Sequence, residues 1–427
     1  MNNPISILSS DKARDTAPAV SGIELAELAA GNSAFACDLY RRLAAAGANN
    51  LFFSPYSISL ALAMTYAGAR EETEDQMART LHFSLPQPSL HPAFNALDLT
   101  LAGRGARTHS EIAEGARPEP AEGANENPAF RLNIINALWG QAGYQFLAPF
   151  LDTLAENYGA GLRLLDFAAA PDQSRLAINE WVSEQTETRI TDLIPAGAID
   201  ALTRLVLTNA IYFNAAWAKP FQAGNTADGL FYPAPGARPE LAEGEPLTVP
   251  MMRQTESFRY AAMAGLSAVE LPYKDRKLAM LILLPDEGNQ AVVEETLDAD
   301  LLEEILGALA PRRIELTMPR FEFSAEFMLK PVLAAMGMPD AFTEAADFSG
   351  MDGGLTLQIA DVIHKAFVDV DEAGTEAAAA TAVIMMTRAM PRFEEPLQLT
   401  LDRPFLFLIR DMPTGTILFS GRLADPG

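Results

Sequence analysis

Hydrophobic and polar positions first recur at helical spacing between Ile23 and Ala45. Apolar side chains there return at intervals of three and four residues, which predicts one face of an amphipathic helix. A break in this helix is expected near Gly31 and Asn32, because glycine weakens a helix interior. Residues 1–20 before it are polar and lack any period, so they are predicted to form a disordered lead-in.

A second helix is predicted from Tyr56 to Ala67, where nearly every position is apolar. A helix that is apolar all round lies buried in the core of a protein. Ser54 and Pro55 come directly before it and act as a start signal, because proline is tolerated in the first helical turn.

Long β-prone runs make up much of the remaining chain. The run from Leu205 to Asn214 has few polar interruptions, as expected of a central strand covered on both faces. Asn209 inside it would be a buried polar group that needs hydrogen-bond partners. Further strands are predicted at 131–139, 258–260, 268–272, 278–284, 314–323, 355–371 and in a hairpin at 405–420, with helices at 174–194, 291–309 and 326–337. Helices first and many strands later indicate an α+β fold with a sheet-dominated core.

Two stretches interrupt this patterning, residues 103–128 and residues 233–246. Both are rich in glycine, proline, alanine and glutamate and show no period. Strand-like sequence resumes directly after the first of them, so surface insertions are predicted, not domain boundaries. A single domain is therefore expected over residues 21–427.

The 427-residue chain is 49% hydrophobic and carries a formal net charge of −25. So acidic a surface repels nucleic acid and anionic membranes, and neither is expected as a partner. No apolar run approaches the ~18 residues of a membrane-spanning helix. Met1 to Val20 lacks the basic start and apolar core of a secretory signal. These features favour a cytoplasmic location, with an extracellular one as the alternative.

Cysteine and histidine are scarce. Cys37 is the only cysteine, which excludes an intramolecular disulfide and any multi-cysteine metal site, and its helical surroundings predict a buried structural thiol. No His-x-x-x-His pair occurs among the histidines, so neither a zinc site nor any other cofactor is expected. The chain also lacks a Gly-x-Ser-x-Gly elbow and a dinucleotide fingerprint, and we do not expect an enzyme. The histidines are His82, His91, His109 and His364.

The segment from Asp371 to Arg392 favours neither helix nor strand. Its alanines and glutamates favour helix, whereas Thr381, Val383 and Ile384 favour strand. At the strand period of two, the face that starts at Thr375 is small at first and apolar later, so it could enter between existing strands without a clash. This property marks a candidate switch between loop and central strand. An ordinary helix or a flexible linker is the alternative that composition alone allows.

From about Glu24 to Leu423 the chain resembles the serpin family. The resemblance rests on a series of segments that follow one another in the family's order and with compatible spacing. These segments are Asn50–Ala69, Asn136–Trp139, Ile178–Val182, Leu205–Phe221, Val249–Met252, Met318–Phe321, Ile363–Ala366, Asp371–Thr381, Asp402–Phe407 and Gly421–Arg422.

The resemblance implies the α+β serpin fold, with three β-sheets, eight to nine helices, a five-stranded central sheet and an exposed reactive-centre loop over residues 371–392. It also implies a suicide substrate for a serine protease. The protease serine attacks the loop and forms an acyl-enzyme. The cut loop then inserts as a new central strand. Because the inserted form has the lower free energy, the uncleaved protein is expected to be metastable. The expected partner is a trypsin-like protease in a covalent complex, and the inhibitor itself is expected to be a monomer.

The family's hinge, the part of the loop that inserts first, is matched from Glu372 onward. Its small side chains keep insertion fast, because bulky or charged ones would have to lose their water. Ala373 departs from the pattern, since a charged residue is common there. The matching hinge residues are Glu372, Gly374, Thr375, Glu376, Ala377, Ala378, Ala379, Ala380 and Thr381.

The reactive bond is predicted between Arg388 and Ala389, where the family's usual spacing from Glu372 ends. Arginine before the cleaved bond suits a protease whose specificity pocket holds a carboxylate, as in trypsin-like enzymes. Cleavage after Met386 or Thr387 would indicate a chymotrypsin-like or elastase-like target instead.

Two further clusters follow from the resemblance. The family's shutter, a hydrogen-bonded patch where the central strands part, is matched by Ser54, Ser57, Asn209 and His364. The breach, at the top of the same sheet, is matched by Trp217, Arg320 and Glu372. An Arg320–Glu372 ion pair is expected there, although lysine is the commoner residue at the first position.

Other functions within the family remain alternatives. A non-inhibitory serpin, such as a chaperone or carrier, usually has bulky, proline or charged hinge residues, and this hinge lacks them. Inhibition of a papain-like cysteine protease stays open. The residues before the first insertion lack the lysines and arginines of heparin-activated relatives, so a heparin cofactor is not expected.

Overall fold

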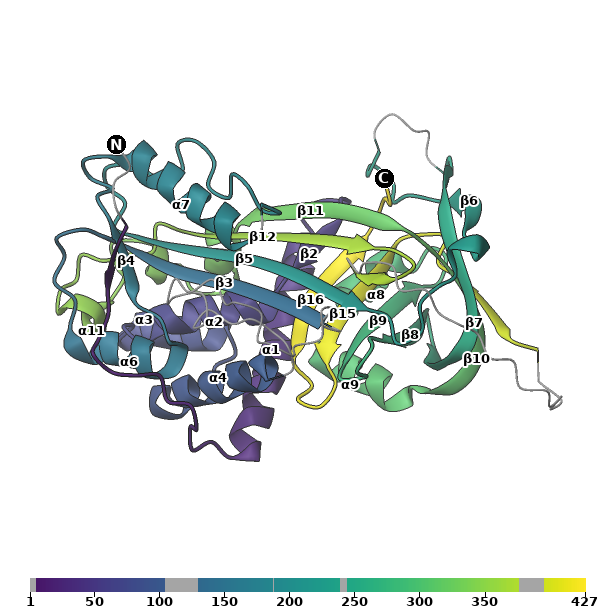
Figure 1. Cartoon of the computed structure of the whole chain (residues 1–427), viewed down its shortest axis with the longest axis horizontal. Coiled ribbons are helices and arrows are strands. Elements are labelled where there is room, and N and C mark those ends of the chain that lie inside the picture. The colour runs from purple at the N-terminus through teal and green to yellow at the C-terminus, as the bar shows by residue number, and fades with distance from the viewer. Residues whose placement is uncertain (1–4, 104–129, 187, 239–243, 376–394) are drawn as a thin grey trace, which may run out of the picture.

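The computed structural model describes residues 5–103, 130–186, 188–238, 244–375 and 395–427. Within these ranges the chain forms two large mixed sheets and ten α-helices (Figure 1). The α+β class predicted from the sequence is confirmed. Most predicted elements recur with shifted ends, and the region from Ala291 to Leu309, predicted as one helix, forms two.

A seven-stranded sheet runs through the centre of the molecule (Figure 1). Five of its strands form the expected central sheet, and two come in addition. One is the N-terminal strand at an edge, and the other is a two-residue strand in the middle. In spatial order the strands are β1 (Ser6–Leu8), β4 (Leu162–Leu165), β3 (Phe130–Gln141), β5 (Leu205–Ala216), β13 (Gly374–Thr375), β12 (Asp361–Val370) and β11 (Phe321–Met328).

The other strands form one nine-stranded sheet, where two separate sheets were expected. They are joined because β7 is long enough to pair with β6 and β10 and then with β8. Along the sheet lie β14 (Leu397–Thr400), β10 (Ala310–Pro319), β7 (Leu247–Met263), β8 (Leu266–Pro272), β9 (Leu278–Pro285), β15 (Phe405–Asp411), β16 (Ile417–Leu423) and β2 (Leu51–Phe53), with β6 (Ala227–Phe231) on β7.

Helices cover both faces of the seven-stranded sheet (Figure 1). Alternate residues of β5, such as Val206 and Ala210, face a small core under α7, while Leu207 and Ile211 face the main core with α1 and α2. This is the two-sided burial predicted for a central strand. The helices are α1 (Gly22–Ala44), α2 (Pro55–Tyr66), α3 (Glu71–Thr80), α4 (Gln87–Ala102), α6 (Ala148–Tyr158), α7 (Pro171–Gln185), α8 (Gln290–Thr296), α9 (Ala299–Ala308), α10 (Lys330–Met336) and α11 (Ser349–Asp352).

Helix α1 is continuous, so the break predicted near Gly31 and Asn32 is wrong. A Cβ atom on Gly31 would lie 2.3 Å from the carbonyl oxygen of His82, so this glycine allows a close approach of the two backbones. The side-chain amide of Asn32 donates to the carbonyl of Ile417 at 3.0 Å. Both residues therefore serve packing and do not end the helix.

The N-terminal segment is also more ordered than its sequence suggested. Strand β1 pairs antiparallel with β4, which extends the central sheet at its edge. Further on, an Arg14 guanidinium nitrogen lies 2.6 Å from a carboxylate oxygen of Asp98, and the amide of Asp15 donates to the carbonyl of Glu156 at 2.8 Å. Such pairing to distant elements cannot be read from local periodicity, because it depends on tertiary contacts.

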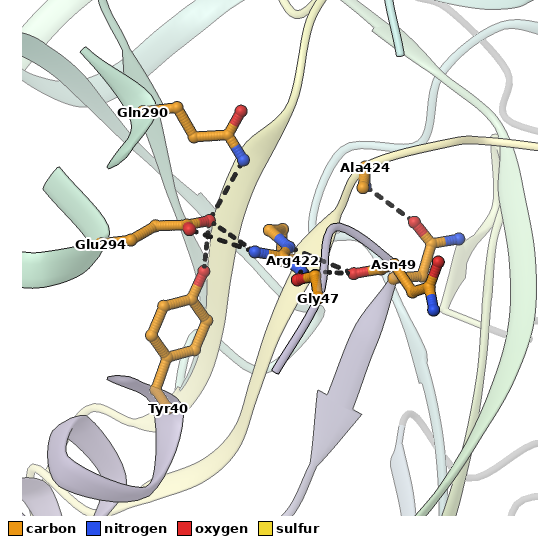
Figure 2. A network of polar contacts seen from close by, with 8 residues as sticks. Tyr40, Gly47, Asn49, Gln290, Glu294, Arg422 and Ala424 are labelled. Carbon is orange, nitrogen blue, oxygen red and sulfur yellow. Dashed lines mark hydrogen bonds and ion pairs between the residues drawn. The ribbon is translucent and has the colours of Figure 1, made fainter. Parts of the chain in front are cut away.

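The C-terminal strand is held by one buried arginine (Figure 2). Arg422 is 2% exposed and donates to both carboxylate oxygens of Glu294 at 3.1 Å. Its other nitrogens donate to the carbonyls of Gly47 and Asn49, and Tyr40 donates to the same glutamate at 3.0 Å. Because this charge is fully paired and hydrogen-bonded, it anchors β16 to α8 and to the loop before β2 without an unpaired buried ion.

None of the described helices is long and apolar enough to cross a membrane.

Candidate functional site

The central sheet forks between β5 and β12. These two strands pair directly and in parallel, from Asp361 opposite Val206 to Phe367 opposite Tyr212. Beyond that point they separate, and β13 lies between them, antiparallel to both. Residues 213–216 of β5 and 368–370 of β12 are called the fork below. The start of the predicted hinge is therefore a short strand within the sheet.

The two hinge residues in the fork fit it closely. A Cβ atom on Gly374 would lie 2.1 Å from the carbonyl oxygen of Ala215, so no side chain can be accommodated there. Thr375 is fully buried, with Val370 opposite it on one side and Ala215 on the other. Its hydroxyl lies 2.8 Å from the hydroxyl of Tyr273, so its polar atom is hydrogen-bonded although it is buried.

A tight turn at Asp371 leads from β12 back into the fork. The Asp371 carboxylate accepts hydrogen bonds from the amides of Ala373 at 2.7 Å and Gly374 at 3.0 Å. The Trp217 indole nitrogen donates to the carbonyl of Asp371 at 3.0 Å, and the Trp217 amide donates to that of Ala373 at 2.9 Å. The turn is thus held both by its own side chain and by β5.

Glu372 lies at the mouth of the fork together with the other predicted breach residues. One of its carboxylate oxygens is 2.9 Å from a guanidinium nitrogen of Arg320, and the other accepts a hydrogen bond from the Thr226 hydroxyl at 2.5 Å. The Arg320 side chain is 46% exposed, so water screens the pair and its contribution to stability is modest. The expected Arg320–Glu372 pair is present, and Trp217 lies close by through its bond to Asp371.

Below the fork, a row of polar residues crosses the closed part of the sheet. Asn136 on β3 lies opposite Asn209 on β5, and Asn209 lies opposite His364 on β12. An imidazole nitrogen, Nδ1, of His364 hydrogen-bonds the Asn209 side-chain oxygen, while Nε2 accepts from the backbone amide of Ser54 at 3.1 Å. The Asn209 amide donates to the Ser57 hydroxyl at 2.6 Å. All four predicted shutter residues therefore meet at the start of α2.

Burial lowers the pKa of His364 to about 3, because its ring is enclosed in the sheet and the charged form would lose its water. Burial also lowers the pKa of His91 to about 4. Both rings are therefore neutral in the folded protein at pH values where an unfolded chain would bind protons. The stability that they contribute is complete above about pH 6.5 and is lost as the pH falls toward these lowered values.

Acidification from pH 7.5 to pH 5.5 is thus expected to lower the free energy of unfolding. The loss should be about 1.4 kcal/mol for each of the two histidines. Urea unfolding at the two pH values measures it. His91→Phe should remove about half of the dependence, because that ring is remote from the fork and packs against Tyr66 and Tyr158. An unfolding free energy that is equal at both pH values would contradict the assignment.

Three members of this site were not foreseen from the sequence: Tyr273, Asn136 and Thr226. A second asparagine inside a β-prone run was a usable signal for Asn136, since a buried amide needs a partner. Tyr273 and Thr226 carry no local signal, because they lie just after β8 and just before β6 and meet the hinge only through the fold. The predicted hinge residues Glu376 to Thr381 and the reactive bond Arg388–Ala389 lie outside the described residues.

In the described ranges, no three histidine, cysteine, aspartate or glutamate side chains are grouped in a way that could hold a metal ion. The fork itself is a slot between β5 and β12 that holds the short strand β13 above the directly paired part of the two strands.

The sequence is similar to a known protein family and to several of its members. A family model described as Serpin (serine protease inhibitor) matches residues 30–426. An uncharacterised serpin-like protein of Thermococcus kodakarensis is 40% identical over 394 residues, covering 92% of this chain and 84% of that protein. The leukocyte elastase inhibitor of Xenopus laevis is 38% identical over 401 residues, covering 92% and 97%.

The fold has close counterparts among solved structures. Human thyroxine-binding globulin, in complex with thyroxine, superimposes with a TM-score of 0.78 at 29% identity, covering 94% of this chain and 99% of that one. The sequence match, the architecture and the forked central sheet agree. The chain belongs to the serpin family.

Proposed function

We propose that this protein inhibits a trypsin-like serine protease by trapping it as an acyl-enzyme. The protease serine oxygen attacks the carbonyl carbon of Arg388, the bond to the nitrogen of Ala389 breaks, and the new amino terminus leaves with a proton. The ester that remains ties the protease to the end of the hinge. Insertion of the hinge between β5 and β12 then removes the protease from the position in which water would hydrolyse the ester.

The observation that carries this proposal is the seating of Gly374 and Thr375 in the fork. These residues lie where an inserting strand must begin, and they already pair with both neighbours. The chain continues into Glu376 and four alanines, whose small side chains could follow between the same strands. Insertion would replace the parallel β5–β12 pairing by two antiparallel ladders.

The energy available for insertion is large. About a dozen new strand residues, at about 1 kcal/mol for each hydrogen bond, give roughly 10 kcal/mol before burial is counted. That equals the stability of a whole domain, so the uncleaved form is metastable and is held by a kinetic barrier. The contact between Asn209 and His364 must be opened before a strand can pass between β5 and β12, and we assign the barrier in part to it.

Arg388 supports a trypsin-like target, because a guanidinium fits a specificity pocket that carries a carboxylate. A second target class has one observation in its favour. Several relatives at 37–38% identity are leukocyte elastase inhibitors, and Met386 or Thr387 lies close enough to serve an elastase-like or chymotrypsin-like protease.

The test is to mix the purified protein with trypsin and look for a complex that survives boiling in SDS. Mass analysis of the released C-terminal peptide should show that it begins at Ala389. A complex with elastase and a peptide that begins at Thr387 or Arg388 would replace the trypsin-like assignment. Cleavage of the loop without any stable complex would favour a non-inhibitory serpin, such as a carrier, and would refute the inhibitor.

A further inference from the structure

An aromatic pair beside the fork, Trp217 and Tyr273, touches both ends of the hinge turn. The ring of Tyr273 stacks on Trp217 with 4.6 Å between centroids and 8° between planes, and meets Phe213 edge-on at 5.2 Å. The Trp217 indole nitrogen donates to the carbonyl of Asp371, and the Tyr273 hydroxyl is hydrogen-bonded to the hydroxyl of Thr375. Because both rings are buried and mutually packed, the Tyr273 hydroxyl has a fixed position at the end of the fork.

We propose that Tyr273 is a positioning residue, whose hydroxyl keeps Thr375 seated in the fork before cleavage and so sets how often a cleaved loop inserts in time. The inference rests on the proposed inhibitory function. It goes beyond that function by naming the group that prepares the hinge for insertion.

The chemistry of the contact suits this role. Burial raises the pKa of Tyr273 well above its ordinary value, so the hydroxyl stays protonated and can donate to Thr375. The bond joins two side chains that are otherwise enclosed by apolar groups, where a hydrogen bond has no competition from water. The close fit of Gly374 against Ala215 excludes a side chain at that position, whereas the hydroxyl pair fixes the register of Thr375.

The consequence is kinetic. After cleavage, insertion competes with hydrolysis of the ester. The chain entropy of bringing the hinge onto the sheet is lost before strand pairing offsets it. A seated Thr375 has already lost part of that entropy. Loss of one hydrogen bond of ordinary net strength would lower the population of the seated hinge relative to the free hinge about fivefold. More of the cleaved protein would then leave as product and less as complex.

The experiment compares Tyr273→Phe, Thr375→Val and the double variant with the wild type. Each single change removes one hydroxyl of the pair and keeps the shape of the side chain. Two readouts are taken: the stoichiometry of inhibition with trypsin, and the amide hydrogen exchange of residues 371–375 in the uncleaved protein. Tyr260→Phe is the matched control, because its hydroxyl bonds Ser267 at 3.0 Å between β7 and β8, away from the hinge.

Each single variant should raise the stoichiometry of inhibition and speed exchange in 371–375 severalfold, up to about fivefold. The double variant should show no more than either single one, because the two hydroxyls act through one bond. Tyr260→Phe should match the wild type in both readouts.

Unchanged exchange in both single variants, or effects that add in the double variant, would overturn the positioning role. If the wild type forms no complex with trypsin, the proposed function fails, and the exchange measurement still decides the seating of the hinge. If Tyr273→Phe does not fold, Thr375→Val tests the same bond from the hinge side.

Discussion

Replacing Thr375 with arginine is expected to abolish the proposed inhibition, so that the protease cuts the variant as an ordinary substrate. Thr375 is fully buried between β5 and β12, and its hydroxyl is bonded to Tyr273. An arginine there would bring an unpaired charge into the sheet at a cost of several kcal/mol, and each 1.4 kcal/mol is about a tenfold change in a rate or equilibrium constant. Insertion would start from an expelled hinge and would lose the competition with ester hydrolysis.

The measurement is the number of inhibitor molecules consumed for each protease molecule trapped. We expect Thr375→Arg to raise this number about tenfold or more, while the loop is still cut at the same bond. Thr356→Arg makes the same change of charge at an exposed position before the start of β12, whereas Thr375 follows the end of that strand, and it should leave the number unchanged. A Thr375→Arg protein that forms the SDS-stable complex as efficiently as the wild type would show that insertion does not begin at the fork.

Cleavage of the loop by a protease is expected to raise the midpoint of thermal unfolding. Roughly 10 kcal/mol of added strand pairing acts on a chain of 427 residues, whose unfolding entropy is about 2 cal/mol/K for each residue. The shift should therefore be about 10 °C or more, since burial of the new strand adds to it. Calorimetry of the intact and the loop-cleaved protein measures this difference.

The Thr375→Arg protein supplies the control for this second result. Cut at the same bond, it should show a much smaller rise, because its hinge cannot enter the sheet. A rise of equal size in both proteins would mean that cleavage stabilises the fold by a route other than insertion at Thr375.

The elements that the sequence predicted well are those whose signals are local. The all-apolar stretch from Tyr56 to Ala67 predicted a buried helix, and the structure has α2 with every residue buried. The run from Leu205 to Asn214 predicted a strand covered on both faces, as β5 is. Gly31 was misread, because a glycine that ends a helix and a glycine that lets two backbones approach look alike in sequence.

The residues of the site also divide into those that the sequence could predict and those that it could not. His364, Asn209 and Arg320 could be named because they lie in segments that resemble those of a known family. Tyr273 could not, because its importance comes from a hydroxyl that reaches Thr375 from just after the end of β8, 102 residues earlier in the chain. The sequence also could not predict that Gly374 and Thr375 already lie in the sheet, since both residues are as compatible with an exposed loop as with a strand.

The most direct test of the central claim is a crystal structure of the protein cut at Arg388–Ala389. We expect the chain from Thr375 onward to run as a full strand between β5 and β12, so that Asn209 and His364 no longer lie opposite each other. A structure in which Asp361 to Phe367 still pair with Val206 to Tyr212, with the cut segment outside the sheet, would contradict it.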